Sequence, residues 1–417
     1  MNPLSIAAWA AALFLAATMF SHTVALRLLM LLLGLALVVV TLVRARVAGR
    51  DAGVQALPPL LVPIVLWSAW AGLSVLWSQE PERSQKEFQN EVVYVYLGFW
   101  LCFVAAQARG ARRVFGIMLG TAGVLACLAG IYVFVAPGAQ PWLERLASGP
   151  GDQSSAMLTL MPCALMAIWL ARNEAAPRTL QRAFWILPPL ILVAAYVTLN
   201  RIVWVGFAIE FGVIVALLLW RPEFDAMRRS GGTRLVPGLI AAAVVGGVAL
   251  VMVQVQVQKL RVKETPSATV ANEPRLEIWA SAVGTVGQHP VTGLGFGRGI
   301  DRRPMVEKLG SVQFWHAHNL ILETAVGSGV PGAVLLLLLI GMTAYKGWRF
   351  ARHENAEVAA YGIALVAVVA GMFVRNLTDA QLARQNALLY WGIVGALLAL
   401  ATVRSASERP TAGAVSA

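Results

Sequence analysis

The sequence predicts an all-α integral membrane protein with about twelve transmembrane helices and one long, partly helical external loop. Three observations predict this fold class. The chain of 417 residues is 58% hydrophobic and only 13% charged, whereas soluble domains carry about 25% charged residues. Its apolar residues form runs of roughly the 20 residues that a helix needs to cross a bilayer. Basic residues recur in alternate loops between these runs, as in polytopic membrane proteins.

The apolar runs give the predicted spans. They are 3–20, 24–43, 59–78, 91–107, 114–136, 156–171, 183–199, 203–220, 235–253, 328–345, 358–374 and 386–403. The first run lacks a preceding basic segment and a cleavage site, so we expect a retained span rather than a signal peptide. Several runs are short, which indicates tilted helices or a locally thinned bilayer.

Charge fixes the expected orientation. The basic residues of every second loop and of the tail are Arg44, Arg46, Arg50, Arg109, Arg112, Arg113, Arg172, Arg178, Arg182, Arg221, Arg228, Arg229, Arg234, Lys346, Arg349, Arg352, Arg404 and Arg409. The positive-inside rule puts these loops and both termini in the cytoplasm. Loops such as 79–90, with Glu80, Glu82 and Glu87, are then external. Cytoplasmic basic loops explain part of the net charge of +12, so no nucleic-acid partner is expected.

The segment 254–327 is the exception to this charge pattern. It is external, longer than any other loop, and contains Lys259, Arg261, Lys263, Arg275, Arg298, Arg302, Arg303 and Lys308. An anionic ligand is the simplest partner for this charge; the alternative is that a long loop escapes the rule and is simply basic. The chain thus divides into helices 1–9 in 1–253, this loop, helices 10–12 in 328–405, and a tail, 406–417, expected to be disordered.

The end of the long loop reads Phe314-Trp315-His316-Ala317-His318-Asn319 and holds two of the five histidines. A titratable pair at a membrane–water boundary indicates chemistry rather than stabilisation. A neutral imidazole, with an ordinary pKa near 6.5, suits a general base. The alternative is interfacial anchoring by Trp315, with the histidines merely solvated nearby.

A metal site is a further alternative for the two histidines. Their spacing permits metal binding in a loop, but no third ligand is evident, although Asp301, Glu307 and Glu323 are available. No metal is therefore expected. The three cysteines, Cys102, Cys127 and Cys163, all fall inside apolar runs and form neither a disulfide framework nor a metal-binding spacing.

Two arginines are candidate anion ligands. Asn272-Glu273-Pro274-Arg275 is predicted to open a helix through about Gly287, with Pro274 in its first turn. Arg275 would then lie at a helix N-terminus, which favours anions; otherwise it is an ordinary surface arginine. Arg201 follows Asn200 where the seventh run meets the external face. It is expected to face a polar cavity, or else to snorkel to lipid head groups.

Three further features complete the external face. Arg375 and Asp379 occupy the last external turn, where they are able to form an ion pair. Gly293, Gly295, Gly297 and Gly299 alternate along the long loop, which predicts a tightly turning or flexible segment around a bulky substrate. No strand–turn–helix unit surrounds them, so a dinucleotide fold is excluded. The sequence also lacks a Walker motif and a Ser/His/Asp signature.

These residues resemble the bacterial O-antigen ligase and polymerase superfamily. The ligase pattern is His, then Asn, Ser or Gln, nine residues, Gly, two residues, then Gly, Thr or Tyr, and His318-Asn319, Gly329 and Gly332 fit it. The preceding run Arg275…Trp279…His289-Pro290…Gly293-Leu294-Gly295 is similar to this family as well. Arg201 matches a family arginine, although Asn200 stands where a serine is common, and Asp379 resembles the acidic residue of the last external loop.

The resemblance implies an all-helical, GT-C-like glycosyltransferase of the bacterial inner membrane, with a periplasmic active site and without metal or other cofactor. Its donor would be O-antigen linked to undecaprenyl pyrophosphate, and its acceptor a sugar hydroxyl of lipid A-core. His318 would be the general base of an inverting displacement, and Arg201 and Arg275 would hold the pyrophosphate. His316, Asn319, Arg375 and Asp379 would be secondary site residues.

Other functions remain open at this point. An O-antigen polymerase or a protein O-oligosaccharyltransferase of the same superfamily would share the donor and differ in the acceptor. A transporter or flippase is the non-enzymatic alternative. Transporters tend to place charges near the membrane midplane, whereas Arg201, Arg275, His318 and Asp379 are predicted at one face. This distribution favours an enzyme.

Overall fold

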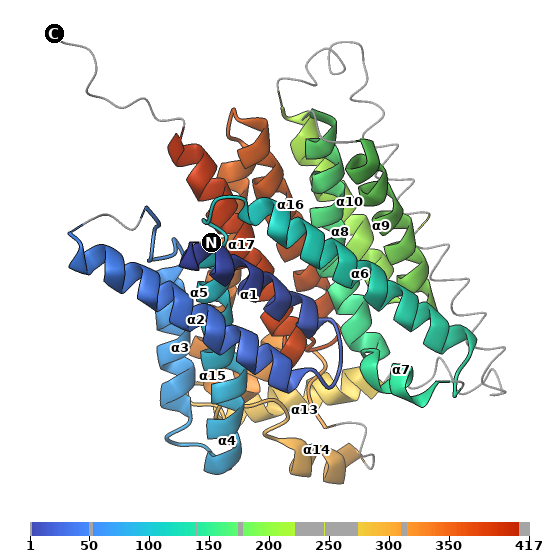
Figure 1. Cartoon of the computed structure of the whole chain (residues 1–417). Coiled ribbons are helices and arrows are strands. Elements are labelled where there is room, and N and C mark those ends of the chain that lie inside the picture. The colour runs from blue at the N-terminus through green and yellow to red at the C-terminus, as the bar shows by residue number, and fades with distance from the viewer. Residues whose placement is uncertain are drawn as a thin grey trace.

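The computed structural model describes residues 2–49, 53–138, 140–173, 178–221, 246, 274–309 and 315–407. In chain order the helices are α1 (Pro3–Thr18), α2 (Val24–Val47), α3 (Leu61–Ser74), α4 (Pro81–Phe88), the π-helical turn η1 (Gln89–Val93), α5 (Tyr94–Ala105), α6 (Ala111–Val135), α7 (Pro141–Leu146), α8 (Pro150–Asn173), α9 (Arg178–Val197), α10 (Ile202–Leu219), α13 (Pro274–Gln288), α14 (Arg302–Leu309), α15 (Leu320–Ala351), α16 (Ala356–Asn376) and α17 (Arg384–Ser407). They form one bundle of long helices, with α13 and α14 at one end (Figure 1).

The described helices confirm the membrane class. Eight of them are long and apolar enough to cross a membrane, and α1, α3 and the Trp185–Val197 part of α9 are shorter apolar helices. Every predicted span coincides with one of these helices except 235–253, which, apart from Gly246, lies outside the described residues. The count of twelve and a GT-C-like fold therefore stay predictions.

Burial separates inner from outer helices. The most apolar windows of α16 and α17 are 72% and 83% buried, against 22% for α2. The centre of the bundle is therefore built from α16 and α17, packed against α5, α8, α10 and α15. The outer face of α2 exposes leucines that would be unfavourable in water, at about 25 cal/mol per Å² of apolar surface, and are suited to lipid.

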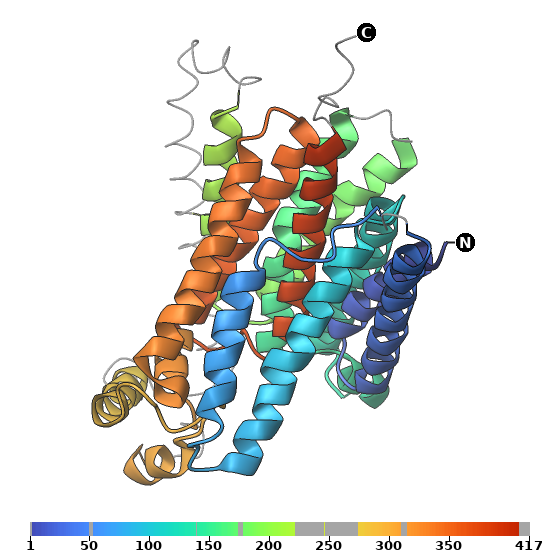
Figure 2. The same ribbon diagram turned by 90° about the vertical axis from the view of Figure 1, so that its left-hand side faces the viewer.

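The loops predicted to be cytoplasmic meet at one end of the bundle. Arg221 donates hydrogen bonds to the carbonyls of His353 and Glu354 at 2.9 and 3.1 Å. Glu357 pairs with Arg112 at 3.0 Å and with Arg404 at 2.9 Å. The opposite end carries α13, α14 and the beginning of α15 (Figure 2). The two ends therefore differ as the charge pattern predicts, while the orientation in the membrane stays a prediction.

One predicted loop is wrong. The loop predicted at 79–90 is largely helical, because α4 begins at Pro81 and continues through η1 into α5. Hydropathy cannot distinguish a polar extension of a helix from a loop. At the tenth span, helix α15 begins at Leu320, where Asn319 caps it, but its backbone is non-helical at Ser328 and Gly329. The predicted start at 328 therefore coincides with this break. Of the tail, α17 extends through Ser407 and the rest lies outside the described residues.

Candidate active site

The helix α15 is broken at the first glycine of the His-Asn motif. Ser328 and Gly329 have non-helical backbone angles, and Gly329 has φ 73° and ψ 176°, a conformation that essentially only glycine adopts. Pro331 follows and has no N–H to continue the helical ladder. The break therefore frees backbone groups that must find other partners.

Neighbouring segments supply those partners. The carbonyls of Val326 and Gly327 accept hydrogen bonds from the N–H groups of Leu294 and Gly295, each at 2.8 Å. The Ser328 carbonyl accepts from the Trp70 indole at 2.8 Å, and the Val330 N–H donates to the Pro290 carbonyl at 2.8 Å. The segment 290–295 is thereby clamped into the break.

The alternating glycines make this clamp possible, which agrees with the predicted tight turning of this segment, while its contact with a substrate stays a prediction. Gly293 and Gly295 have positive φ. A Cβ at Gly293 would meet the Gly327 carbonyl, and one at Gly295 would meet Ser78. These glycines therefore allow close contact with α15 and with the turn between α3 and α4. Gly293 and Gly295 therefore have a packing role that the sequence pattern alone did not reveal.

Glu323, in the first turn of α15, organises the histidine loop. Its carboxylate accepts hydrogen bonds from the backbone N–H of Gly299 and, at 2.6 Å, from that of Ala317. Its side chain is only 8% exposed. A buried carboxylate that takes up two backbone donors fixes the loop at Gly299 and Ala317 in relation to the helix.

His316 is the buried histidine of the pair, at 2% exposure. Its Nδ1 lies 3.0 Å from the backbone N of His318, and its Nε2 lies 3.1 Å from a guanidinium nitrogen of Arg298. A neutral imidazole has only one acceptor nitrogen, so it accepts only one of these two hydrogen bonds at a time, and the tautomer decides which. Burial, together with the positive charge of Arg298 and the neighbouring His318, lowers the pKa of His316 to about 3. His316 is therefore neutral at ordinary pH.

His318 faces a carboxylate. Its side chain is 27% exposed, and its Nδ1 lies 3.4 Å from Oδ1 of Asp379. Its backbone is left-handed, with φ 46°, and its ring lies against that of His316 with centroids 3.7 Å apart. The more exposed imidazole is thus held between a neutral histidine and a carboxylate from the α16–α17 loop.

Asp379 collects donors from several elements. It accepts from the Gln381 amide at 2.9 Å and pairs with Arg375 at 3.5 Å, and Arg298 lies 3.8 Å away. Burial alone would raise the pKa of Asp379, but the hydrogen bond with His318, the charge of Arg375 and the Gln381 amide together bring it below its ordinary value. Asp379 is therefore a carboxylate, and the ion pair expected with Arg375 is present.

Asn319 fastens this arrangement to the bundle. Its side-chain oxygen caps α15 by accepting from the N–H groups of Ile321 and Leu322 at 2.9 and 3.0 Å. Its amide donates to the Leu377 carbonyl at 2.9 Å. The cap is a helix-start preference that sequence can signal, whereas the bond to Leu377 joins segments distant in the chain.

The structure brings a third potential metal ligand, which the sequence did not indicate, to the two histidines. One potential ligand atom from each of His316, His318 and Asp379 lies within 4.8 Å of the others. Two guanidinium groups, those of Arg298 and Arg375, also face this cluster within 4 Å of the histidine or carboxylate atoms. Positive charges this close oppose binding of a divalent cation. The arrangement fits an anionic ligand better, and a metal-free site stays our prediction.

The two predicted phosphate-binding arginines lie at the same end of the bundle. The helix predicted to carry Arg275 is confirmed as α13; Arg275 is exposed, and its charge acts on Arg375. Arg201 precedes α10, beside Asn200, whose amide donates to Ser154 at 3.1 Å. Helix α10 packs on α16, and Arg221, which follows the end of α10, bonds to the α15–α16 turn where α16 begins. Arg201, at the start of α10, therefore lies near the other end of α16, which carries Arg375.

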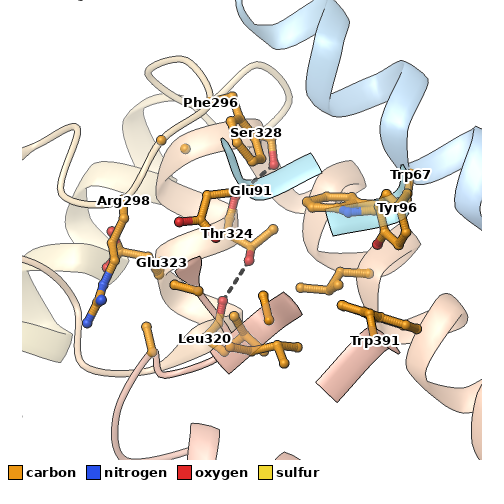
Figure 3. Close-up of a pocket in the computed structure, with 17 residues that line it drawn as sticks. Trp67, Glu91, Tyr96, Phe296, Arg298, Leu320, Glu323, Thr324, Ser328 and Trp391 are labelled. Atoms are coloured by element: carbon orange, nitrogen blue, oxygen red, sulfur yellow. Dashed lines mark hydrogen bonds between the residues drawn. The ribbon is translucent and has the colours of Figure 1, made fainter. Parts of the chain in front are cut away.

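A cavity of about 90 Å³ adjoins the histidine loop (Figure 3). Arg298 and Glu323 line one part of it, and Trp67, Tyr96 and Trp391 line another. Arg298 also lies over the Trp315 ring, with its Cζ 4.9 Å from the ring centroid. In the sequence, Arg298 is only one charge among many, because its contacts with His316 and Asp379 depend on the fold.

Comparison with known proteins bears on this region of the chain. A search of curated proteins gives no match. Residues 186–337 match the family model described as O-Antigen ligase. This segment contains Arg201, Arg275 and the His316–Asn319 loop, and it ends beyond the break in α15. This segment of the chain is therefore similar to the O-antigen ligase family.

Proposed function

We propose that the protein is an O-antigen ligase of the bacterial inner membrane. It transfers O-antigen from undecaprenyl pyrophosphate to a sugar hydroxyl of lipid A-core at the periplasmic face. The observation that carries the proposal is the His318–Asp379 pair, at 3.4 Å, in a chain similar to this family. A partly exposed imidazole beside a carboxylate is the arrangement of a general base.

Asp379 orients the base in this mechanism. As a carboxylate, it accepts the Nδ1–H of His318, which leaves the lone pair on Nε2. Nε2 then takes the proton of the acceptor hydroxyl as that oxygen attacks the anomeric carbon. His316, neutral and buried, holds the backbone of His318. It acts as a positioning residue.

The leaving group requires positive charge. As the new carbon–oxygen bond forms, the bond from the anomeric carbon to the pyrophosphate oxygen breaks, and its electron pair remains on the pyrophosphate. Arg201 and Arg275 are the proposed partners of this charge, with the N-terminus of α13 beside Arg275. A single displacement inverts the anomeric centre, and no pair of catalytic carboxylates is required.

The test is transfer by the purified protein in detergent. The wild-type protein is incubated with the glycan linked to lipid pyrophosphate and with lipid A-core, and the ligated product is detected over time by mass spectrometry. His318→Ala should lower the rate by about 10²–10⁴ while donor binding is retained. His22→Ala is the matched control, because His22 is exposed and also has a left-handed backbone, with φ 58°. Normal transfer by His318→Ala would remove the proposed base.

Two arms of the same assay test the partners of the base. Asp379→Asn keeps the shape and loses the charge, so transfer should fall, and Asp379→Glu should restore part of it. EDTA should leave the wild-type rate unchanged. Loss of transfer in EDTA that added metal restores would instead favour the His316, His318 and Asp379 cluster as a metal centre.

The acceptor distinguishes the related functions. A polymerase would extend a second lipid-linked glycan, and a protein O-oligosaccharyltransferase would modify a polypeptide, with the same donor. The ligase proposal expects product only with lipid A-core. Transfer in detergent, where no gradient exists, also excludes a transport mechanism as the origin of the product.

A further inference from the structure

A second, polar cleft of about 720 Å³ lies at the site end of the bundle. It is formed by the beginning of α2, the continuous α4–η1–α5 helix and the beginning of α17. Its lining consists of Val24, Arg27, Glu82, Arg83, Lys86, Glu87, Asn90, Glu91, Tyr94, Arg384, Gln385 and Leu388. The volume falls within the roughly 300–1,000 Å³ of small-molecule sites. None of these residues belongs to the mechanism proposed above.

Two buried polar groups in this cleft point to a ligand. Arg27 is only 7% exposed, and its Nε has no hydrogen-bond partner among the described residues. The hydroxyl of Tyr94 is likewise buried and has no such partner within the described part of the chain. Buried polar atoms are costly unless something satisfies them. A ligand oxygen near both side chains would do so.

The rest of the lining defines the chemistry of that ligand. Lys86 and Arg384 line the same cleft as Arg27 and add positive charge that suits a phosphate, whereas the charge of Arg83, a further lining residue, is paired with Glu80 at 3.2 Å. Glu82 and Glu87, with the amides of Asn90 and Gln385, present acceptors and further donors. Sugar hydroxyls both donate and accept hydrogen bonds, so this mixture fits a phosphorylated saccharide better than a simple anion.

The cleft is connected to the histidine site. Glu91 lines both the cleft and the cavity beside Arg298 and Glu323. Its carboxylate accepts from the backbone N–H of Arg384 at 2.9 and 2.7 Å. Arg384 is the first residue of α17 and directly follows the α16–α17 loop that contains Asp379. A ligand head group in the cleft thus lies one cavity away from the proposed base.

The surface beside the cleft suits lipid chains. On α2, directly after Arg27, Leu28, Leu29 and Leu32 are 46%, 58% and 56% exposed. Figure 1 shows α2 along the outside of the bundle beside α5. An amphiphile with its head group beside Arg27 would therefore have an apolar helix face along which its acyl chains pack.

We propose that this cleft binds the head group of the acceptor, a phosphorylated, acylated saccharide, with a phosphate on Arg27. This inference rests on the proposed function, since it assigns the second substrate of the same reaction. Donor and acceptor would then approach His318 from different sides, the donor from Arg201 and Arg275 and the acceptor from α2.

Binding to the full-length purified protein in detergent tests the proposal without turnover. The probe is a diphosphorylated, acylated disaccharide lipid, compared with the same lipid after removal of its phosphates. Arg27→Gln should weaken binding of the phosphorylated probe at least tenfold and leave binding of the dephosphorylated probe unchanged. Arg46→Gln is the matched control, an arginine in the last turn of the same helix. Lys86→Gln, at an exposed lining position, should weaken binding of the phosphorylated probe severalfold. This second variant keeps the test valid if Arg27→Gln fails to fold.

Transfer assays separate the cleft from the function. Arg27→Gln should raise the acceptor KM at least tenfold, with kcat and the donor KM unchanged. Unaltered probe binding by both Arg27→Gln and Lys86→Gln would overturn the proposal. Competition by phosphatidylglycerol as strong as that by the unlabelled probe would also overturn it, and so would variants that lose donor binding while they keep probe binding. If wild type binds the probe through Arg27 but transfers no glycan, the proposed function fails and the glycolipid site stands.

Discussion

At the scale of single residues, two histidines of one short loop have different environments. His316 is 3% exposed in its side chain, and His318 is 27% exposed. The buried ring meets Arg298, and the exposed ring meets Asp379. The resemblance to the family assigned the base to His318 and a secondary role to His316, but the sequence could not show their different burial, because burial depends on Glu323 and on the α16–α17 loop.

The pKa of His316 gives a prediction about acid stability. In the folded protein it is about 3, below the ordinary 6.5 of an unfolded chain. Below pH 6.5 the unfolded state therefore takes up a proton that the folded state does not, and stability falls as pH falls toward 3. His316→Gln should reduce the loss of thermal stability between pH 7 and pH 4.5, as measured by melting in detergent. Equal losses in wild type and the variant would contradict this, and His22→Gln should behave as wild type.

The exposed arginines give a second residue-scale prediction. Arg201→Ala and Arg275→Ala should each cost about 2–4 kcal/mol of transition-state stabilisation, the scale for losing one preorganised donor. Lysine should restore only part of the rate, because it lacks the bidentate fork. Arg303→Ala, an exposed position of α14, is the control. Full turnover by either alanine variant at saturating donor would reassign that arginine to a structural role.

At the scale of elements, the break in α15 makes two glycines of one helix non-equivalent. Gly329→Ala should lower the melting temperature and the activity, because its backbone is left-handed and a Cβ would meet the Val291 carbonyl; strain of this kind costs about 1–3 kcal/mol. Gly341→Ala is the matched control, since nothing lies within 4 Å of a Cβ there. That change should be neutral or stabilising. Equal effects of the two substitutions would remove the structural explanation of the motif glycine.

Local signals were sufficient for part of this architecture. The Pro274 helix start and the apolar runs are properties of neighbouring residues, and both appear in the structure. The extension of α4 through η1 was not visible, because its polar residues resemble a loop. Arg298, Glu91 and Trp67 were missed as site residues because only tertiary packing brings them to the cavity beside the histidine loop.

At the scale of the whole molecule, the basic and catalytic ends should lie on opposite sides of the membrane. A cysteine at Arg302, exposed on α14, should react with an impermeant maleimide added to spheroplasts. A cysteine at Arg349, exposed near the opposite end of α15, should react only after lysis. Cys102 and Cys127 are buried, which limits background labelling. The reverse result would invert the topology and exclude a periplasmic site.

The clamp at the break of α15 also fixes the number of residues between His318-Asn319 and Gly329, the two parts of the motif. Residues 320–327 run as helix from the Asn319 cap to the break at Ser328 and Gly329, with a rise of roughly 1.5 Å and a rotation of about 100° per residue. Asn319 is tied to Leu377 at one end, and Gly329 is held by the 290–295 segment at the other. An inserted alanine between them would turn His318 by about 100° away from Asp379. Substitutions in this stretch are therefore easier to accommodate than any change in its length.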